Sequence, residues 1–339
     1  MLQIKERVNL KPYNTFGIEV ECSYFSEIHN EVDFLELLKT DIYKNKQKLI
    51  LGGGSNILFT KNFEGIIIKN SLKGITVVTE TSEEVIVKAN AGEGWHELVM
   101  WCIDKNYGGI ENLSLIPGCV GASPMQNIGA YGVEIKDFFY ELEALDIETG
   151  KKQIFNLEDC KFGYRESVFK HDLKNKFFIS SVSFKLKKNA KLNTSYGAIN
   201  NELERMKIAT PTIKDVSNAV IAIRQSKLPD PKVTGNAGSF FKNPEVSEEF
   251  YLKLKSKFEN SVAYPLSNGN YKLAAGWLIE QCGLKGYEFN GAAVHTKQAL
   301  VLINKNNCDG ISVYKLSTYV LQKVFDTFGV TLEREVNIN

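Results

Sequence analysis

The sequence predicts a mixed α/β protein, of the α+β kind, built from more than one domain. Its 339 residues exceed what one hydrophobic core usually fills, and 43% of them are apolar, enough for two or three cores. Glycine-broken β-rich runs occupy residues 48–69, and an alternating hairpin pattern at 75–91 precedes a helical period at 95–105. Strand-like runs recur over 138–187 with no regular helix between them, which argues against repeated βαβ units.

A break in the pattern near residue 228 separates the last third of the chain. Pro229 and Pro231 disfavour helix at the residues that precede them, so we expect a domain boundary there. Apolar residues at helical spacing predict helices at 212–226, 271–282 and 312–328.

The charge and the cysteine content exclude several classes of function. The chain has 41 basic and 40 acidic side chains, and its net charge of +1 gives no long-range field for nucleic acid or an anionic membrane. The six cysteines include no C-x-x-C pair and the four histidines are scattered, so no metal site is expected. The N-terminal segment has no apolar core, and no run approaches the roughly 20 apolar residues that span a bilayer. We therefore expect a cytoplasmic protein whose cysteines are free thiols.

Two glycine-rich stretches are candidates for a phosphate-binding backbone. In the first, "LGGGSN" at 51–56, three glycines follow an apolar strand and allow backbone N–H groups to converge on an anion. No Lys-Ser or Lys-Thr follows, and no G-x-G-x-x-G opens a helix, so neither common nucleotide motif is present. An ordinary loop remains the alternative for this stretch.

The second glycine-rich stretch, "IPGCVGASPMQNIGAYGVE" at 116–134, is more apolar than a surface loop. Glycines within an apolar segment favour close approach of the backbone to something flat or large, and Ser123 and Asn127 can add hydrogen bonds. A tight packing corner is the competing interpretation. Two such stretches in one chain make a dinucleotide ligand more plausible.

A third candidate is Ser239, in "GNAGSFFKNP" at 235–244. A nucleophilic serine usually needs a base and often lies on a G-x-S-x-G elbow, which is absent here, so a hydrolase is disfavoured. A loop formed by the neighbouring glycines is the plain alternative. The stretch alone leaves the hydroxyl as nucleophile, proton donor or turn residue.

The motifs taken together resemble a known family. "NTFG" at 14–17 and "AGEGW" at 91–95, with the two glycine-rich stretches, are similar to FAD-binding proteins of the vanillyl-alcohol oxidase type. The resemblance narrows to the UDP-N-acetylenolpyruvoylglucosamine reductase family through "CKFGYRES" at 160–167, "KLPDPKVTGNAGSFFKNP" at 227–244, "KLAAGWLIEQCGLKG" at 272–286 and "GAAVHTKQALVLIN" at 291–304. It covers nearly the whole chain.

The resemblance implies a two-part FAD-binding domain followed by a C-terminal α/β substrate-binding domain. The implied ranges are 1–72, to which 330–339 return, then 73–227 for the second FAD-binding part and 228–329 for the UDP-sugar domain. FAD is expected between the two glycine-rich stretches. Ser55 stands where covalent flavoproteins of this fold commonly have a histidine, so the resemblance implies noncovalent FAD.

The family's reaction sets the chemistry that the site must perform. In this family NADPH reduces FAD, and the flavin then passes a hydride to UDP-N-acetylglucosamine enolpyruvate, which gives UDP-N-acetylmuramate for peptidoglycan. The adjacent carbon becomes carbanionic, so the site needs a cation and a proton donor. We expect both substrates to use one cleft in turn, with ping-pong kinetics, in a monomer.

Three residues match the family's catalytic positions. Ser239 matches the proton donor, so the resemblance favours an acid over a nucleophile. Arg165 matches the arginine that contacts the substrate carboxylate, and a guanidinium is suited to holding an enolate. Glu335 matches a glutamate that works with that arginine. Our hypothesis is that Lys227, Lys242 or a chain of water molecules stabilises the serine alkoxide.

Other matched positions concern binding. Tyr196 matches a tyrosine on a flexible loop that closes over the UDP diphosphate in the longer form of the family. The remaining matches to UDP-sugar binding are Arg224, Lys227, Gln298 and Asn243, and Asn243 is also expected to orient Ser239. The residues expected to bind FAD are Gly52, Gly53, Gly54, Ser55, Asn56, Gly118, Gly121, Ala122, Ser123, Gln126, Asn127 and Gly129.

Two other functions are compatible with parts of the sequence. A flavin oxidase or dehydrogenase of the same fold would not respond to UDP-sugars, and the third domain argues against it. A binding module for FAD or UDP-sugar would bind flavin without NADPH turnover. The presence of Arg165, Ser239 and Glu335 in one chain disfavours the second alternative.

Overall fold

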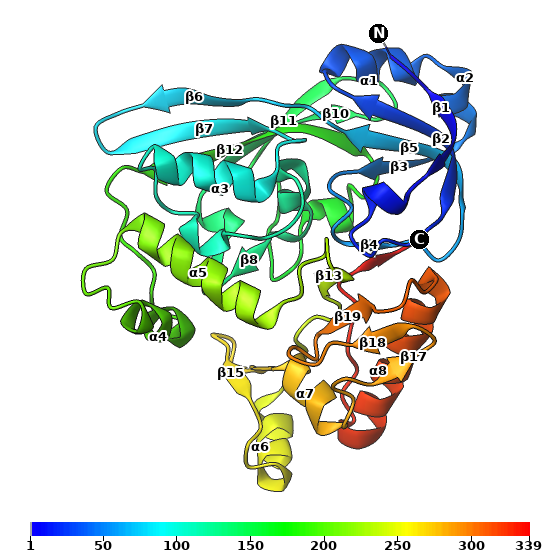
Figure 1. Cartoon of the computed structure of the whole chain (residues 1–339). Coiled ribbons are helices and arrows are strands. Elements are labelled where there is room, and N and C mark those ends of the chain that lie inside the picture. The colour runs from blue at the N-terminus through cyan, green and yellow to red at the C-terminus, as the bar shows by residue number, and fades with distance from the viewer. Residues whose placement is uncertain (1) are drawn as a thin grey trace. The chain divides into compact units, whose positions relative to one another are not determined.

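The computed structural model describes residues 2–339 and confirms a mixed α/β fold (Figure 1). The chain forms two compact units. The larger unit contains the chain up to Val8, Glu21–Gly54 and Phe63–Ser226, and the smaller contains Asn9–Val20, Ser55–Asn62 and Lys227–Asn339. Two short segments from the first part of the chain therefore fold with the C-terminal third.

One sheet of the larger unit is parallel at its centre. Its strands lie in the order β1 (Lys5–Asn9), β2 (Glu21–Ile28), β5 (Phe63–Asn70) and β3 (Gln47–Leu51). Because β5 pairs in parallel with both β2 and β3, the chain must cross over between them. The crossover from β2 to β3 consists of α1 (Glu31–Leu38) and α2 (Asp41–Asn45), which are capped by the side chains of Asn30 and Thr40.

The other main sheet of the larger unit is antiparallel. Its order is β11 (Lys152–Asn156), β10 (Phe139–Asp146), β12 (Phe177–Lys187), β7 (Glu84–Asn90) and β6 (Ile75–Glu80). The hairpin predicted at 75–91 is confirmed as β6 and β7, and the helix predicted at 95–105 is confirmed as α3 (Trp95–Asp104). A small hairpin of β8 (Gly129–Ala130) and β9 (Val133–Glu134) follows α3.

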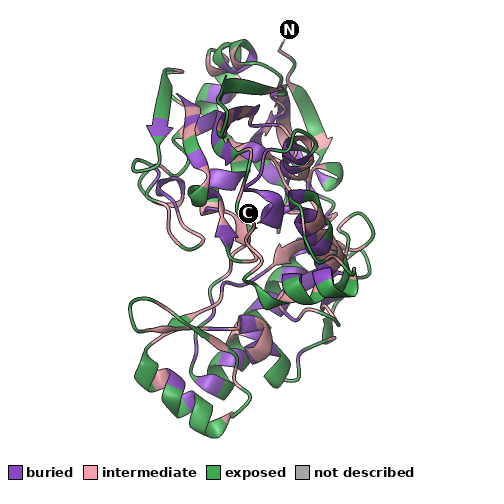
Figure 2. Ribbon diagram, turned by 90° about the vertical axis from the view of Figure 1, so that its left-hand side faces the viewer, coloured by how far each residue is buried: buried purple, intermediate pink, exposed green. Residues whose placement is uncertain are grey.

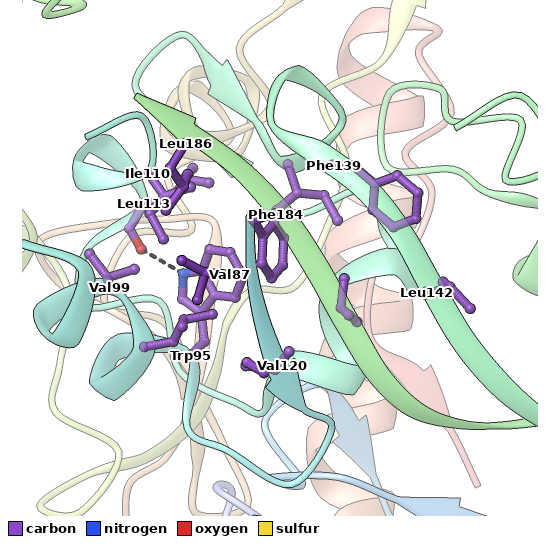
Figure 3. Close-up of a cluster of buried hydrophobic side chains, with 14 of the residues drawn as sticks. Val87, Trp95, Val99, Ile110, Leu113, Val120, Phe139, Leu142, Phe184 and Leu186 are labelled. Atoms are coloured by element: carbon purple, nitrogen blue, oxygen red, sulfur yellow. Dashed lines mark hydrogen bonds between the residues drawn. The ribbon is translucent and has the colours of Figure 1, made fainter. Parts of the chain in front are cut away.

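The buried core of the larger unit lies between α3 and the antiparallel sheet (Figure 3). Trp95 is 1% exposed, and its ring meets that of Phe184 edge to face at 5.5 Å. The indole Nε1 donates a hydrogen bond to the backbone oxygen of Leu113 at 2.9 Å. Val120 belongs to the same cluster, so the second glycine-rich stretch is built directly on this core.

Two further helices pack together in the larger unit. Val216 and Val220 on α5 (Ile213–Lys227) contact Ile199 on α4 (Gly197–Arg205) in one buried cluster. The helix predicted at 212–226 is confirmed and shifted by one residue.

The smaller unit combines short antiparallel strands with helices. One sheet has the order β13 (Gly235–Ser239), β19 (Val301–Asn304), β18 (Ala292–Val294) and β17 (Glu288–Phe289). Another has the order β14 (Glu245–Val246), β16 (Tyr271–Leu273) and β15 (Ala263–Pro265). The helices are α6 (Glu248–Lys257), α7 (Ala275–Gln281) and α8 (Gly310–Phe328). Figure 2 colours the chain by burial and shows that α6 is largely exposed. All residues of β18 and β19 are buried.

The prediction of a helix at 271–282 is wrong for its first residues. Tyr271–Leu273 is strand β16, and α7 begins only at Ala275. Pairing of β16 with both β14 and β15 fixes these residues as strand, so tertiary contacts override the local helical spacing.

The last helix agrees with the prediction at 312–328 and begins two residues earlier. The side chain of Asp309 accepts a hydrogen bond from the Ser312 amide at 2.8 Å and caps the helix. Gly329 ends it with a φ of 68°, a left-handed value that favours glycine. The chain then finishes in β20 (Asn337–Ile338), which pairs in parallel with β4 (Ile57–Leu58).

The structure bears on two expectations from composition. Over residues 2–339 no helix is both long and apolar enough to cross a membrane. The same part of the chain has no cluster of three His, Cys, Asp or Glu placed to hold a metal ion, and its cysteines are free.

We predict that Trp95→Phe destabilises the protein by about 2 kcal/mol, because the smaller ring leaves a void and strands the buried Leu113 carbonyl without its donor. Thermal unfolding followed by circular dichroism measures the change. Trp101→Phe is the matched control, since Trp101 is only partly buried, and should cost less than half as much. Equal losses in the two variants would contradict a special role for the Trp95 hydrogen bond.

Candidate functional site

Glycines of the two glycine-rich stretches lie backbone to backbone in the larger unit. A Cβ atom added to Gly53 would lie 2.9 Å from the Cα atom of Gly118, closer than side-chain atoms approach. One added to Gly52 would lie 3.7 Å from the Cβ atom of Ala122. Segments far apart in the sequence thus form one wall of small residues, and such a wall permits the close approach that a phosphate group needs.

The "AGEGW" motif holds the second stretch in this position. Its backbone pairs with the stretch in a short ladder. The bonds run from Gly121 N to Ala91 O at 2.9 Å, from Val120 N to Glu93 O at 2.8 Å and from Trp95 N to Gly118 O at 2.9 Å. Glycine is required at position 121 as well, because a Cβ atom there would lie 2.4 Å from that of Ala91. The motif therefore holds in place the surface formed by Gly52, Gly53, Gly118 and Ala122, which we call the glycine wall.

Ser123 and Asn127 shape the second stretch from within. They are 1% and 0% exposed. The Ser123 hydroxyl donates to the Val120 carbonyl at 2.7 Å. The Asn127 amide donates to a Glu134 carboxylate oxygen and to the Gly163 carbonyl, both at 3.0 Å. Both side chains thus bond to protein groups and hold the shape of this stretch.

Arg165 adds a positive charge at the end of the same stretch. Its Nη2 donates to the Gly129 carbonyl at 2.7 Å, and its guanidinium lies over the Tyr164 ring at 5.4 Å from the centroid. The backbone of Arg165 has a left-handed φ of 56°, which is uncommon for a residue with a side chain. The hydrogen bond and the ring together fix the place of this cation.

A second arginine, Arg224 on α5, lies among tyrosines. The Tyr131 hydroxyl is hydrogen-bonded to its guanidinium, and the Tyr131 and Tyr196 rings meet edge to face at 5.3 Å. Burial lowers the pKa of Arg224 and raises the pKa of Tyr131 from their ordinary values. The Nε atom of Arg224 is enclosed and has no hydrogen-bond partner. An oxygen-rich ligand would satisfy this donor.

Sequence reasoning did not single out Tyr131. It lies in the "GAYG" part of the second glycine-rich stretch, so the motif itself was identified from the sequence. Its contact with Arg224 depends on the packing of α5, and no local pattern indicates it.

Ser239 ends strand β13 in the smaller unit. Gly238 has a φ of 70°, and its N–H donates to the Asn236 side-chain oxygen at 2.9 Å, which fixes the turn before the serine. The backbone N–H of Asn236 in turn donates to the Thr15 carbonyl at 3.0 Å. The "NTFG" motif therefore anchors the strand that carries Ser239.

Glu335 lies on the segment that runs beside the residues after Ser239. Its N–H donates to the Phe240 carbonyl at 2.8 Å, and the Lys242 N–H donates to the Glu333 carbonyl at 2.9 Å. Lys242 is 7% exposed, and its ammonium pairs with the Glu333 carboxylate at 2.6 Å. Backbone pairing, together with an ion pair between the buried Lys242 and the exposed Glu333, positions Glu335.

Asn243 and Gln298 both lie next to the first turn of α7. The Asn243 side-chain oxygen accepts a hydrogen bond from the Ala275 N–H at 2.9 Å, so this atom positions α7. A Cβ atom on Gly276 would lie 3.0 Å from the Gln298 side-chain oxygen. Lys227, the last residue of α5, is exposed.

The predicted site residues divide between the two units. The larger unit holds Gly52, Gly53, Gly54, Gly118, Gly121, Ala122, Ser123, Gln126, Asn127, Gly129, Arg165, Tyr196 and Arg224. The smaller unit holds Ser55, Asn56, Lys227, Ser239, Asn243, Gln298 and Glu335. Within the smaller unit the Asn56 side-chain amide donates to the Glu335 carbonyl at 3.2 Å, so the end of the first glycine-rich motif contacts the glutamate segment.

Comparison with known proteins identifies two regions of the chain. Residues 27–155 match the FAD binding domain, and residues 230–339 match the C-terminal domain of UDP-N-acetylenolpyruvoylglucosamine reductase. The curated UDP-N-acetylenolpyruvoylglucosamine reductase of Flavobacterium johnsoniae is 50% identical, over 99% of this chain and 100% of its own. That of Pseudomonas savastanoi pv. phaseolicola is 47% identical over 99% of both chains.

A solved structure has the same fold over the full length. The UDP-N-acetylenolpyruvylglucosamine reductase of Thermus caldophilus superposes with a TM-score of 0.68 at 20% identity, and covers 100% of this chain and 99% of that chain. Identity of 47–50% over the whole length decides the family. The chain belongs to the UDP-N-acetylenolpyruvoylglucosamine reductase family.

Proposed function

We propose that this chain reduces the enolpyruvyl ether of UDP-N-acetylglucosamine enolpyruvate to the D-lactyl ether, with NADPH as reductant and noncovalent FAD as cofactor. The product is UDP-N-acetylmuramate, a peptidoglycan precursor. Full-length identity of 50% to a curated reductase carries the proposal. We propose that the enzyme acts as a cytoplasmic monomer. Residues 1–72 with 330–339, and 73–227, would bind FAD, and 228–329 the UDP-sugar.

The glycine wall is the proposed FAD site. A side chain on Gly53 would clash with the Gly118 backbone, and Gly118 has a φ of 112°, a value that favours glycine; such a glycine-lined backbone suits a cradle for a pyrophosphate. Backbone groups of Gly52, Gly54, Gly121 and Ala122 would contact the same region. Ser55, Asn56, Gln126 and Gly129 would complete it, and Ser123 and Asn127 would hold its shape. When bound, FAD supplies hydride-transfer chemistry, for which the protein provides binding and orientation.

Ser239 is the proposed donor of the proton that the reduced carbon receives. A serine hydroxyl is a weak acid, so a nearby cation must stabilise the alkoxide left behind. Lys242 already pairs with Glu333 at 2.6 Å, which offsets its charge. This pairing favours Lys227 for the stabilising role.

Arg165 and Glu335 are proposed to act on the carboxylate end of the substrate. The guanidinium is held by the Gly129 carbonyl and the Tyr164 ring, and such preorganised charge stabilises an enolate at little reorganisation cost. The UDP-sugar is assigned to a set of polar side chains. They are Tyr131, Tyr196, Arg224, Lys227, Asn243 and Gln298. The unpartnered Nε of Arg224 supports this assignment.

The two half-reactions test the proposed function directly. Anaerobic protein is first reduced with NADPH, and the flavin absorbance is followed after addition of UDP-N-acetylglucosamine enolpyruvate. We expect rapid reoxidation together with formation of UDP-N-acetylmuramate. Reduction without reoxidation would instead support an oxidase or dehydrogenase acting on another substrate.

Ser239→Ala should leave flavin reduction by NADPH intact and slow reoxidation by the enolpyruvyl substrate about 10³-fold, because only the second half-reaction needs the proton donor. Stopped-flow absorbance separates the two steps. Ser256→Ala is the control, since this hydroxyl lies exposed on α6. Normal reoxidation in the Ser239 variant would assign the proton to another group.

Gly53→Ala should lower the affinity for FAD at least about tenfold, because a methyl group there would force the two glycine-rich stretches apart. The ratio of flavin to protein absorbance after gel filtration reports the occupancy. Gly197→Ala is the matched control, since a Cβ atom at Gly197 meets nothing within 4 Å. Full occupancy in the Gly53 variant would place FAD elsewhere.

A further inference from the structure

His96 makes a contact with the residue just before the second glycine-rich stretch, and the reaction does not explain this contact. It lies in the first turn of α3, directly after the "AGEGW" motif. Its ring Nδ1 accepts a hydrogen bond from the backbone N–H of Leu115 at 3.0 Å. An imidazole nitrogen accepts a hydrogen bond only when it carries no proton, so this geometry selects the neutral ring with its proton on Nε2.

The bonded residue is a strained one. Leu115 has a φ of 58°, in the left-handed region that bulky side chains rarely occupy. It directly precedes Ile116, the first residue of the second glycine-rich stretch. Nearby, Trp95 Nε1 donates to the Leu113 carbonyl at 2.9 Å. Two neighbouring side chains of α3 therefore hold the backbone where the chain turns toward Gly118.

The surroundings of His96 favour the neutral ring. Burial lowers the pKa of His96 from its ordinary value, and the positive charge of Arg224 on α5 acts in the same direction. Glu97, the next residue on α3, opposes them. Among residues 2–339, Glu97 and Arg224 are the charged groups whose fields shift the pKa of the ring, and Arg224 is itself hydrogen-bonded to Tyr131.

We propose that His96 is a positioning residue for FAD: its neutral ring holds the Leu115 amide and so sets where the second glycine-rich stretch meets the first. The inference rests on the FAD placement proposed above. Protonation would turn Nδ1 into a donor facing the Leu115 N–H donor and would add a positive charge beside Arg224. Affinity for FAD should therefore fall as the pH drops through the pKa of the ring, which burial lowers from the ordinary histidine value.

Two substitutions distinguish the effect of the hydrogen-bond acceptor at Nδ1 from the effect of the size of the ring. The shorter side chain of His96→Asn would place its oxygen near the position of Nδ1, whereas the longer side chain of His96→Gln places its oxygen near that of Nε2. Titration of the apoprotein with FAD at pH 8, followed by flavin fluorescence, should give His96→Asn an affinity within about threefold of wild type. His96→Gln should bind about tenfold more weakly, which corresponds to about 1.4 kcal/mol, a typical cost for a stranded donor. Equal affinities in the two variants, or weaker binding by His96→Asn, would overturn the proposal.

The pH dependence supplies a readout that a purely structural role would not change. Between pH 8 and pH 5.5 the wild-type dissociation constant for FAD should rise more than that of His96→Asn, which has no ring to protonate. The loss accumulates below about pH 6.5 because the pKa of the ring is lowered in the folded protein. Parallel pH profiles would contradict the role of the ring.

Gly53→Ala distinguishes a failure of the FAD placement from a failure of the role of His96. If it binds FAD normally, the proposed FAD placement fails, whatever the His96 variants do. If it binds weakly while His96→Gln binds normally, the placement stands and the role of His96 fails.

Discussion

The close approach of the Gly53 and Gly118 backbones is the constraint on which the rest of the larger unit depends. A side chain on Gly53 would clash with the Gly118 backbone, and the φ of 112° at Gly118 itself favours glycine, so each stretch carries glycine where they meet. Glycine has high conformational freedom in the unfolded chain, so the folded position must be fixed by other groups. The backbone ladder from the "AGEGW" motif supplies that fixation, and the Trp95 core supports the ladder in turn.

In the smaller unit, polar side chains fix the glycine-containing backbone next to Ser239. Ser239 follows Gly238, whose left-handed backbone is stabilised by the Asn236 side chain. Asn236 is tied to Thr15, and Asn304 on β19 donates to the Phe16 carbonyl at 2.9 Å. The "NTFG" motif thus anchors β13, the strand that carries the proposed proton donor, although the motif lies more than two hundred residues earlier in the chain. Such distant anchoring explains why this early segment folds with the C-terminal third.

Lys242 in the smaller unit is buried, Arg224 in the larger unit has an enclosed Nε atom, and the two cations are matched differently. Lys242 lies almost fully buried and is matched by Glu333, whereas Arg224 has one enclosed nitrogen without a partner. A largely buried and matched charge is suited to holding a segment in place, and an incompletely matched one is suited to receiving an anion. The two cations therefore differ in kind: Lys242 stabilises the fold around Glu335, and Arg224 offers a donor to a ligand.

Local patterns in the sequence determined α5, α8 and the β6–β7 hairpin. In each of these segments the spacing of apolar residues is regular along the whole element. Local patterns failed at Tyr271–Leu273, because pairing with β14 and β15 decides a short strand. The family resemblance supplied the candidate residues from their motifs, since residue type and order are properties of the chain alone.

Only the tertiary structure decided how those residues are used. Ser123 and Asn127 were expected to bind FAD, but burial directs both side chains to protein groups. Tyr131 and His96 gain their roles from Arg224 and Leu115, which lie far from them in the sequence. The sequence by itself therefore determined the chemical groups available, and packing determined their partners, because a hydrogen bond depends on distance and burial rather than on order along the chain.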